Sequence, residues 1–195
     1  MAYELKNYEN LIGMKGLSEQ ILKNHFTLYQ GYVTNVKKVS EILANLSREN
    51  KTSSPEYAEL KRRFAWEFNG MRLHESYFEN ISKDGKAIDK DSKIYKKIAE
   101  DFGSYENWEK DFKATLAVRG IGWGILHYDA KEKRLFNSWI NEHDSGHLSG
   151  AIPLLVIDVF EHAFMIDYGI KRADYIEAMM KLINWDEVEK RFENK

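Results

Sequence analysis

Asp158-Val159-Phe160-Glu161-His162 is the stretch around which the rest of the chain is interpreted. The apolar run before it, residues 151–157, ends in β-branched residues and predicts a buried strand that stops at Asp158. A buried carboxylate must take up a proton or find a cation, and His162 offers a neutral nitrogen four residues later. Asp158 and His162 are therefore candidate metal ligands. One such pair also arises by chance, so the assignment depends on the rest of the sequence.

The composition is that of a globular and mostly helical protein, with 43% hydrophobic residues and two prolines in 195 residues. The 29 basic and 31 acidic side chains nearly cancel, which argues against binding to nucleic acid or to an anionic membrane. There is no cysteine, so nitrogen and oxygen atoms would have to hold any metal. Because the sequence shows neither an apolar segment of membrane-spanning length nor a secretory signal, we expect a cytoplasmic protein.

The N-terminal half predicts an irregular arm, residues 1–16, and then two long helices. Ser18 is a candidate N-cap of the first helix, and Pro55 directly after Ser54 is typical of the first turn of the second. The polar link between the helices is short, which favours an antiparallel hairpin. His25 and His74 would then face one interior. The inner face of the first helix is expected to include Ile21, Leu22, His25, Leu28, Tyr29, Tyr32, Val33 and Val36.

The C-terminal half changes in pattern after a charged, glycine-containing segment. We place the boundary there, between an N-terminal helical domain, residues 1–88, and a C-terminal α/β domain, residues 89–195. Asn184 is expected to cap a last short helix. Further helices are predicted over residues 93–102, 105–118 and 172–182, and strands over residues 120–128, 134–140 and 151–157, with the first two strands forming a hairpin.

Three of the six histidines, His25, His74 and His162, stand at predicted inward positions of core elements. A single buried histidine is more often a hydrogen-bonded core residue than a ligand. Three of them with a buried aspartate are harder to explain in that way, since each group would need a separate partner. Such a set suits iron or manganese, and zinc would also tolerate it. We expect His127 and His147 at the surface or in loops.

At this point the sequence resembles a known family, the iron/manganese superoxide dismutases, over nearly its whole length. Residues 158–168 are similar to the family's Asp-Val-Trp-Glu-His-Ala-Tyr signature. Residues 102–105 and 120–126 are similar to its Phe-Gly-Ser and Gly-Ser-Gly-Trp blocks. The resemblance implies an α+β fold with an N-terminal antiparallel helical hairpin and a C-terminal domain that holds a three-stranded antiparallel sheet and surrounding helices. The periodicity of the sequence predicts the same layout.

The resemblance further implies an enzyme that converts superoxide to oxygen and hydrogen peroxide at one iron or manganese ion per subunit. The implied metal ligands are His25, His74, Asp158 and His162. It also implies a homodimer, in which Glu161 reaches a ligand histidine of the partner subunit. Two alternatives stay open: a protein of this fold with a structural or binding role and no redox activity, and a zinc hydrolase.

The resemblance assigns catalytic roles to Tyr32 and His143. Tyr32 would relay protons and narrow the entrance, although it follows His25 by seven residues where the family usually has eight. A plain core tyrosine is the alternative. His143 stands where manganese-type members carry a glutamine that bonds metal-bound solvent. Iron-type members place that glutamine four residues before the second ligand histidine, where this chain has Gly70. Members with histidine use iron or accept either metal, so the metal stays open.

Three further residues are implied around the pocket. Trp123 and Phe160 would wall it, and Phe160 replaces a tryptophan of the family signature. Tyr29 stands where the family usually carries a second histidine at the substrate entrance.

Overall fold

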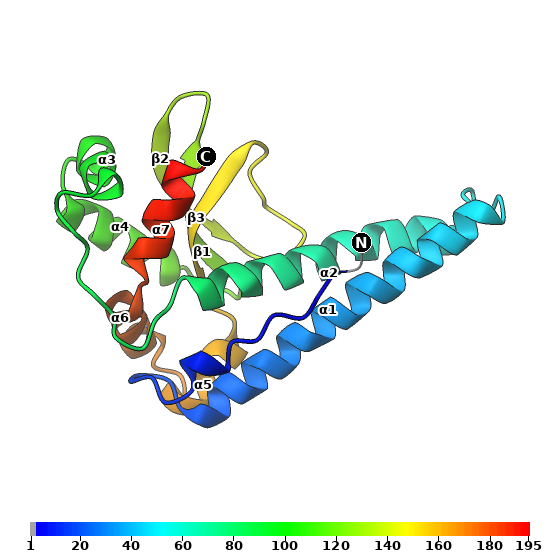
Figure 1. The fold of residues 1–195 in the computed structure, drawn as a ribbon, viewed down its shortest axis with the longest axis horizontal. Helices are drawn as coiled ribbons and strands as arrows, with labels where there is room; N and C mark the ends of the chain where they lie inside the picture. Colours follow the sequence, from blue (N-terminus) through cyan, green and yellow to red (C-terminus); the bar gives the residue numbers. More distant parts are fainter. Residues whose placement is uncertain (1–2) are drawn as a thin grey trace.

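The computed structural model describes residues 3–195 and consists of a long helical hairpin followed by a small sheet with shorter helices around it (Figure 1). The predicted α+β fold class is confirmed. The hairpin helices are α1 (Glu19–Arg48) and α2 (Pro55–Glu79). Within residues 3–195, no helix is both long enough and apolar enough to cross a membrane.

Both hairpin helices begin at the predicted caps. The Ser18 hydroxyl accepts a hydrogen bond from the backbone N–H of Ile21 (3.2 Å), and Ser54 accepts one from that of Tyr57 (3.1 Å). Pro55 lies in the first turn of α2, where its missing N–H breaks no helical hydrogen bond. Signals within four residues of each start are therefore sufficient to set where these helices begin.

The inner face of α1 is largely as predicted. Tyr29 is buried and Tyr32 is half-buried, but Leu28 is 40% exposed, so its predicted place on this face is wrong. Leu28 immediately precedes Tyr29 in the helix, so its side chain points about 100° away from that of Tyr29. The far end of the hairpin, near residue 50, extends away from the rest of the molecule, while the other end packs against the sheet (Figure 1). His25 and His74 therefore lie near the ends of α1 and α2 that pack against the core.

Residues 3–17 form the predicted irregular arm, interrupted by one short 3₁₀ helix, η1 (Glu9–Leu11). The arm runs along the hairpin (Figure 1). The ring of Tyr8 packs against those of Tyr29 and Phe78, with ring centroids 5.8 Å and 4.9 Å apart. The arm therefore covers the part of the hairpin nearest the core.

The helices of the C-terminal half are close to their predicted ranges. They are α3 (Lys93–Phe102), α4 (Tyr105–Leu116), η2 (Glu161–Ala163), α5 (Met165–Tyr168), α6 (Arg172–Leu182) and α7 (Trp185–Glu193). The predicted bounds of α3 and α6 are confirmed, and α4 ends two residues before the predicted Val118. Asn184 directly precedes α7, as predicted, but the predicted side-chain cap is wrong. Its side chain makes no cap bond and instead donates to the carbonyl of Glu79 (3.2 Å).

The sheet consists of β1 (Trp123–Asp129), β2 (Arg134–Ile140) and β3 (Ala151–Asp158), in the antiparallel order β2-β1-β3. The hairpin predicted between the first two strands is confirmed. β1 begins three residues later than predicted, after Gly122, where φ is 128° and a Cβ would lie 1.9 Å from the Ile140 carbonyl oxygen. Trp123 pairs with Asp158 across β1 and β3, so the start of one strand lies beside the end of the other.

One buried asparagine joins the hairpin to the sheet. Asn80, just after α2, donates to the carbonyl of Leu154 (3.2 Å) and accepts from the N–H of Val156 (2.8 Å). It is fully buried. The end of α2 is thereby held against β3. The domain boundary between residues 88 and 89 stays a prediction.

The prediction for His127 is also wrong, since this residue was expected at the surface or in a loop. It lies on β1 and is 3% exposed, with its Nδ1 2.9 Å from the Ser138 hydroxyl and its ring stacked on Phe136. Burial lowers the pKa of its imidazole to about 4. His147 is exposed in the segment between β2 and β3, as predicted.

Candidate metal centre

Four side chains from separate elements converge where the hairpin meets the end of the sheet. His25 comes from α1, His74 from α2, Asp158 from the last residue of β3, and His162 from η2. Each offers one ligand atom, and these atoms all lie within 4.8 Å of one another. The Asp158 Oδ2 atom lies 3.2 Å from the Nε2 atoms of His25 and His162 and 3.8 Å from that of His74. The structure therefore brings together the four residues implied by the sequence.

Burial and charge prepare these groups for a cation. Burial lowers the pKa of His25 and takes that of His74 well below its ordinary value, so both imidazoles favour the neutral form that binds metals. Burial alone would raise the pKa of Asp158, but the neighbouring imidazoles of His162 and His25 outweigh it and hold that pKa far below its usual range. An ionised carboxylate thus faces the neutral imidazoles of His25 and His74, and its charge raises the pKa of the His162 imidazole.

His74 shows most directly that a metal ion fits. Its Nδ1–H donates to the carbonyl oxygen of Gly70 (2.6 Å), because a carbonyl can only accept. The Nε2 atom therefore carries the lone pair, and it is fully buried with no hydrogen-bond partner within residues 3–195. A buried nitrogen lone pair aimed at a carboxylate is otherwise costly, and a bound cation would satisfy both groups.

A second group of residues surrounds the ligands. His143, in the segment between β2 and β3, is 1% exposed. Its Nε2 lies 2.7 Å from the Tyr32 hydroxyl, and its Nδ1 accepts from the indole N–H of Trp123 (3.1 Å). The Tyr32 ring stacks on that of His74, with centroids 5.1 Å apart. The Phe160 ring lies 5.0 Å from that of His143, so aromatic rings enclose this side of the cluster.

Tyr29 lies on another side, beneath the N-terminal arm. It is buried, its hydroxyl donates to Glu75 (3.0 Å), and that hydroxyl oxygen accepts from the backbone N–H of Lys6 (3.2 Å). Tyr29 and residues of the arm line a cavity of about 240 Å³. Its hydroxyl is occupied by these contacts, and the entrance role implied for it stays a prediction.

Glu161 is exposed at the start of η2, immediately before His162. The side chain of His162 is 27% exposed, which makes it the outermost of the four ligands. Three exposed apolar residues follow along the chain: Met165, Ile166 and Ile170.

The sequence alone suggested no role for Trp66, and for Gly70 it showed only that the glutamine of iron-type members is missing there. The Trp66 ring lies 4.7 Å from that of His143, and Gly70 accepts the His74 hydrogen bond. Both precede His74 at intervals of four residues, so they share its helix face. That spacing was available in the sequence and could have identified them.

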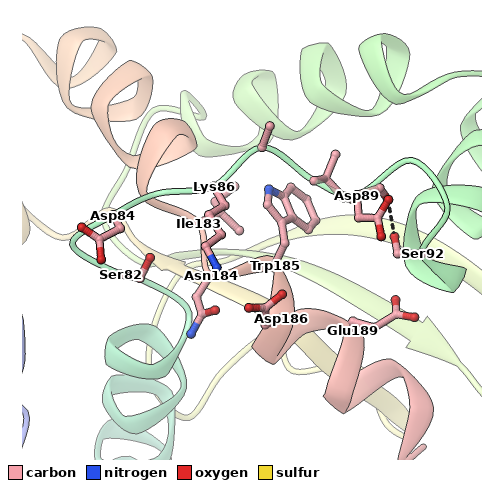
Figure 2. Close-up of a pocket in the computed structure, with 12 residues that line it drawn as sticks. Ser82, Asp84, Lys86, Asp89, Ser92, Ile183, Asn184, Trp185, Asp186 and Glu189 are labelled. Atoms are coloured by element: carbon pink, nitrogen blue, oxygen red, sulfur yellow. Dashed lines mark hydrogen bonds between the residues drawn. The ribbon is translucent and has the colours of Figure 1, made fainter.

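A cavity of about 500 Å³ lies elsewhere, between the 82–92 linker and the start of α7 (Figure 2). None of the four candidate ligands lines it. Its acidic groups include Glu189, whose carboxylate accepts from the backbone N–H groups of Lys93 (2.9 Å) and Ile94 (2.7 Å) at the start of α3. Glu189 therefore serves to cap a helix, and the cavity is separate from the metal centre.

Comparison with known proteins points to one family. Residues 90–191 match the profile of the iron/manganese superoxide dismutases, C-terminal domain. The chain is 36% identical to the manganese superoxide dismutase 2 of Haloferax volcanii over 196 residues, covering 99% of this chain and 96% of the relative. It is 38% identical to the iron superoxide dismutase of Aquifex aeolicus over 186 residues, covering 92% and 86%. Relatives of similar identity thus carry the name of either metal.

Proposed function

The chain belongs to the iron/manganese superoxide dismutase family and is an enzyme of that type, and we propose that its reaction takes place at one ion held by three histidines and one aspartate. The four residues are His25, His74, Asp158 and His162. The observation that carries this proposal is the convergence of their ligand atoms within 4.8 Å, with the Nε2 of His74 buried and unpartnered among the described residues. Iron or manganese, when bound, supplies the one-electron exchange with superoxide, and the donor set allows either metal.

The reaction turns two superoxide ions and two protons into oxygen and hydrogen peroxide, so the protein must supply protons. In this proposal Tyr32 and His143 do so. The indole N–H of Trp123 can only donate, so the Nδ1 of His143 accepts and the proton of the neutral ring is on Nε2. That Nε2–H donates to the Tyr32 oxygen. The hydroxyl proton of Tyr32 is thereby left free to be donated toward the site.

The electrostatics support these roles. Burial, with a further contribution from the charge of Asp158, raises the pKa of Tyr32 to about 12, so the phenol keeps its proton at neutral pH. Burial lowers the pKa of His143 to about 4, so the ring stays neutral and retains the tautomer described above. Trp123 and Phe160 would exclude water from the pocket.

A homodimer is part of the proposal. Glu161 is exposed beside His162, and the exposed side chains of Met165 (44%), Ile166 (52%) and Ile170 (93%) follow it. Exposed apolar side chains close together in the chain are typical of an interaction surface, and a two-fold axis would bring Glu161 of each subunit toward its partner. Sedimentation of Glu161→Ala at decreasing concentration tests this, since a weakened dimer dissociates at higher concentration than the wild type does.

The proposed setting is cytoplasmic, with removal of superoxide as an antioxidant function. No observation on residues 3–195 favours the alternative of a family-fold protein without redox activity, because all four ligand residues are present and adjacent. Fractionation of cells that express the chain checks the location.

Metal analysis combined with superoxide consumption tests the site. The protein is loaded separately with iron and with manganese, and His74→Ala is compared with Arg62→Ala, an exposed residue on the same helix. We expect about one ion per subunit in the wild type and in Arg62→Ala, and loss of both metal and activity in His74→Ala. Full activity of His74→Ala would overturn the ligand assignment.

A further inference from the structure

Two glycines lie in the interiors of the hairpin helices, Gly31 in α1 and Gly70 in α2. Glycine weakens a helix interior relative to alanine, because it loses more backbone freedom on folding. The surroundings of the two positions differ. A Cβ at Gly31 would meet no atom of the described residues within 4 Å, whereas a Cβ at Gly70 would lie 2.5 Å from Cδ1 and 2.6 Å from Cε1 of Tyr32.

The contact at Gly70 leaves no room for a side chain. Carbon atoms that are not bonded to each other pack at about 3.5–4.0 Å, so a methyl group at this position and the present ring of Tyr32 exclude one another. The ring has little freedom to withdraw, since it also stacks on His74 and holds its hydroxyl 2.7 Å from His143. The face of Tyr32 therefore lies directly on the backbone of α2.

The position of Tyr32 along α1 explains why its ring reaches α2. Seven residues separate it from His25, which in a regular helix places the two side chains within about 20° of the same direction. His25 points at the cluster shared with His74, so Tyr32 points at the turn of α2 that precedes His74. Gly70 lies on that turn, four residues before His74.

We propose that Gly70 is a positioning residue for the reaction: its missing side chain admits the Tyr32 ring and so lets the phenol reach His143. The inference rests on the proton-supplying role of Tyr32 given under the proposed function. The hydrogen bond that Gly70 accepts from His74 does not require glycine, because every residue has a backbone carbonyl. The three atoms nearest to a Cβ at this position all belong to Tyr32, so the Tyr32 ring accounts for its absence.

Thermal unfolding of the metal-loaded protein, with the metal content of every variant verified, tests the packing part of this inference. Gly70→Ala is compared with Gly31→Ala, each in the wild type and in a Tyr32→Ala background. We expect Gly31→Ala to raise the melting temperature in both backgrounds. Gly70→Ala is expected to lower it when Tyr32 is present and to raise it when Tyr32 is alanine. If Gly70→Ala fails to fold alone, folding restored by Tyr32→Ala supports the inference, and failure to restore it overturns the inference.

Steady-state kinetics at verified metal content tests the functional part. We expect Gly70→Ala to lower kcat about as much as Tyr32→Phe does, by about 100-fold or more. The double variant Gly70→Ala/Tyr32→Phe is expected to lose no more than Tyr32→Phe alone. An effect of Gly70 that was only structural would add to that of Tyr32→Phe.

The inference is overturned if Gly70→Ala raises the melting temperature as Gly31→Ala does and keeps wild-type kcat. Full activity of Tyr32→Phe would contradict the proposed role of Tyr32 instead, and the melting temperatures would still report whether Gly70 admits the ring.

Discussion

The two halves of the chain contribute to the metal centre in different ways. The hairpin supplies His25 and His74 from the interiors of α1 and α2, where the helix itself sets the direction of each side chain. The C-terminal half supplies Asp158 from the end of β3 and His162 from the short η2, and His143 stands in an irregular segment. Residues in long helices are positioned by their element, whereas those at strand ends and in loops depend on their contacts.

Many of those contacts cross from one half to the other. Asp158 faces His25 and His74 of the hairpin, and His143 lies between Trp123 of the sheet and Tyr32 of α1. Changes to residues that both halves share should therefore have the largest effects. Changes confined to one half, away from the centre, should affect stability and leave the chemistry intact.

The largest effect is expected for Asp158→Ala, because both halves use this carboxylate. Its loss removes a proposed ligand and leaves the N–H of Phe160, 2.7 Å from Oδ1, without its acceptor. We expect metal content and activity to fall by more than the roughly 100-fold that loss of an outer partner costs. Metal analysis and superoxide consumption measure this, with the exposed Asp186→Ala as control. Retained metal in Asp158→Ala would contradict the shared role.

A smaller effect is expected at His143, which is not one of the four candidate ligands but lies beside His74, with ring centroids 5.9 Å apart. His143→Ala removes the acceptor of Trp123 and the donor to Tyr32, and we expect a loss of kcat of about 10–100-fold with metal still bound. His143→Gln should retain more activity, since an amide has both an acceptor and a donor. Equal activity of the two variants would show that these hydrogen bonds do not matter.

A change at His127 tests the C-terminal half separately, since this residue is buried in the sheet away from the candidate ligands. Its pKa is about 4 when folded and about 6.5 when unfolded, so the unfolded state takes up the proton first as pH falls. Stability from this group is present above pH 6.5 and is lost toward pH 4. Between pH 7 and pH 5, we expect the free energy of unfolding of His127→Gln to fall by about 2 kcal/mol less than that of the wild type.

Urea unfolding of the wild type and of His127→Gln at the two pH values measures the effect. An unchanged pH dependence in His127→Gln would mean that its imidazole is not held neutral by the sheet. Activity per bound ion at pH 7 should be the same in His127→Gln as in the wild type.

The smallest effect is expected at the far end of the hairpin. Ser54→Ala removes the hydroxyl that accepts from the Tyr57 N–H, and loss of an N-cap costs about 1 kcal/mol. Activity and metal content should not change, because this end of the hairpin extends away from the centre (Figure 1). Urea unfolding and steady-state assays measure both quantities, and a loss of kcat in the folded variant would show that the two ends are coupled.

Much of the fold was predictable because its signals are local. The caps at Ser18 and Ser54 act within three residues, and the bounds of β2 agree with the predicted strand. The predictions that were wrong concern which residues of other segments cover a given side chain. His127 was assigned to the surface because its own segment does not reveal that Ser138 and Phe136 of the neighbouring strand cover it.

For the candidate site, too, local features were predictable and contacts between distant segments were not. The sequence by itself determined the types of ligand and the elements that carry them, since helical spacing and strand ends are properties of short segments. Only the tertiary structure decided that Nε2 of His74 has no partner among residues 3–195, that Trp123 sets the tautomer of His143, and that Tyr32 rests on Gly70. These are contacts between distant segments, up to 111 residues apart for Tyr32 and His143, and burial and hydrogen-bond direction exist only once such segments meet.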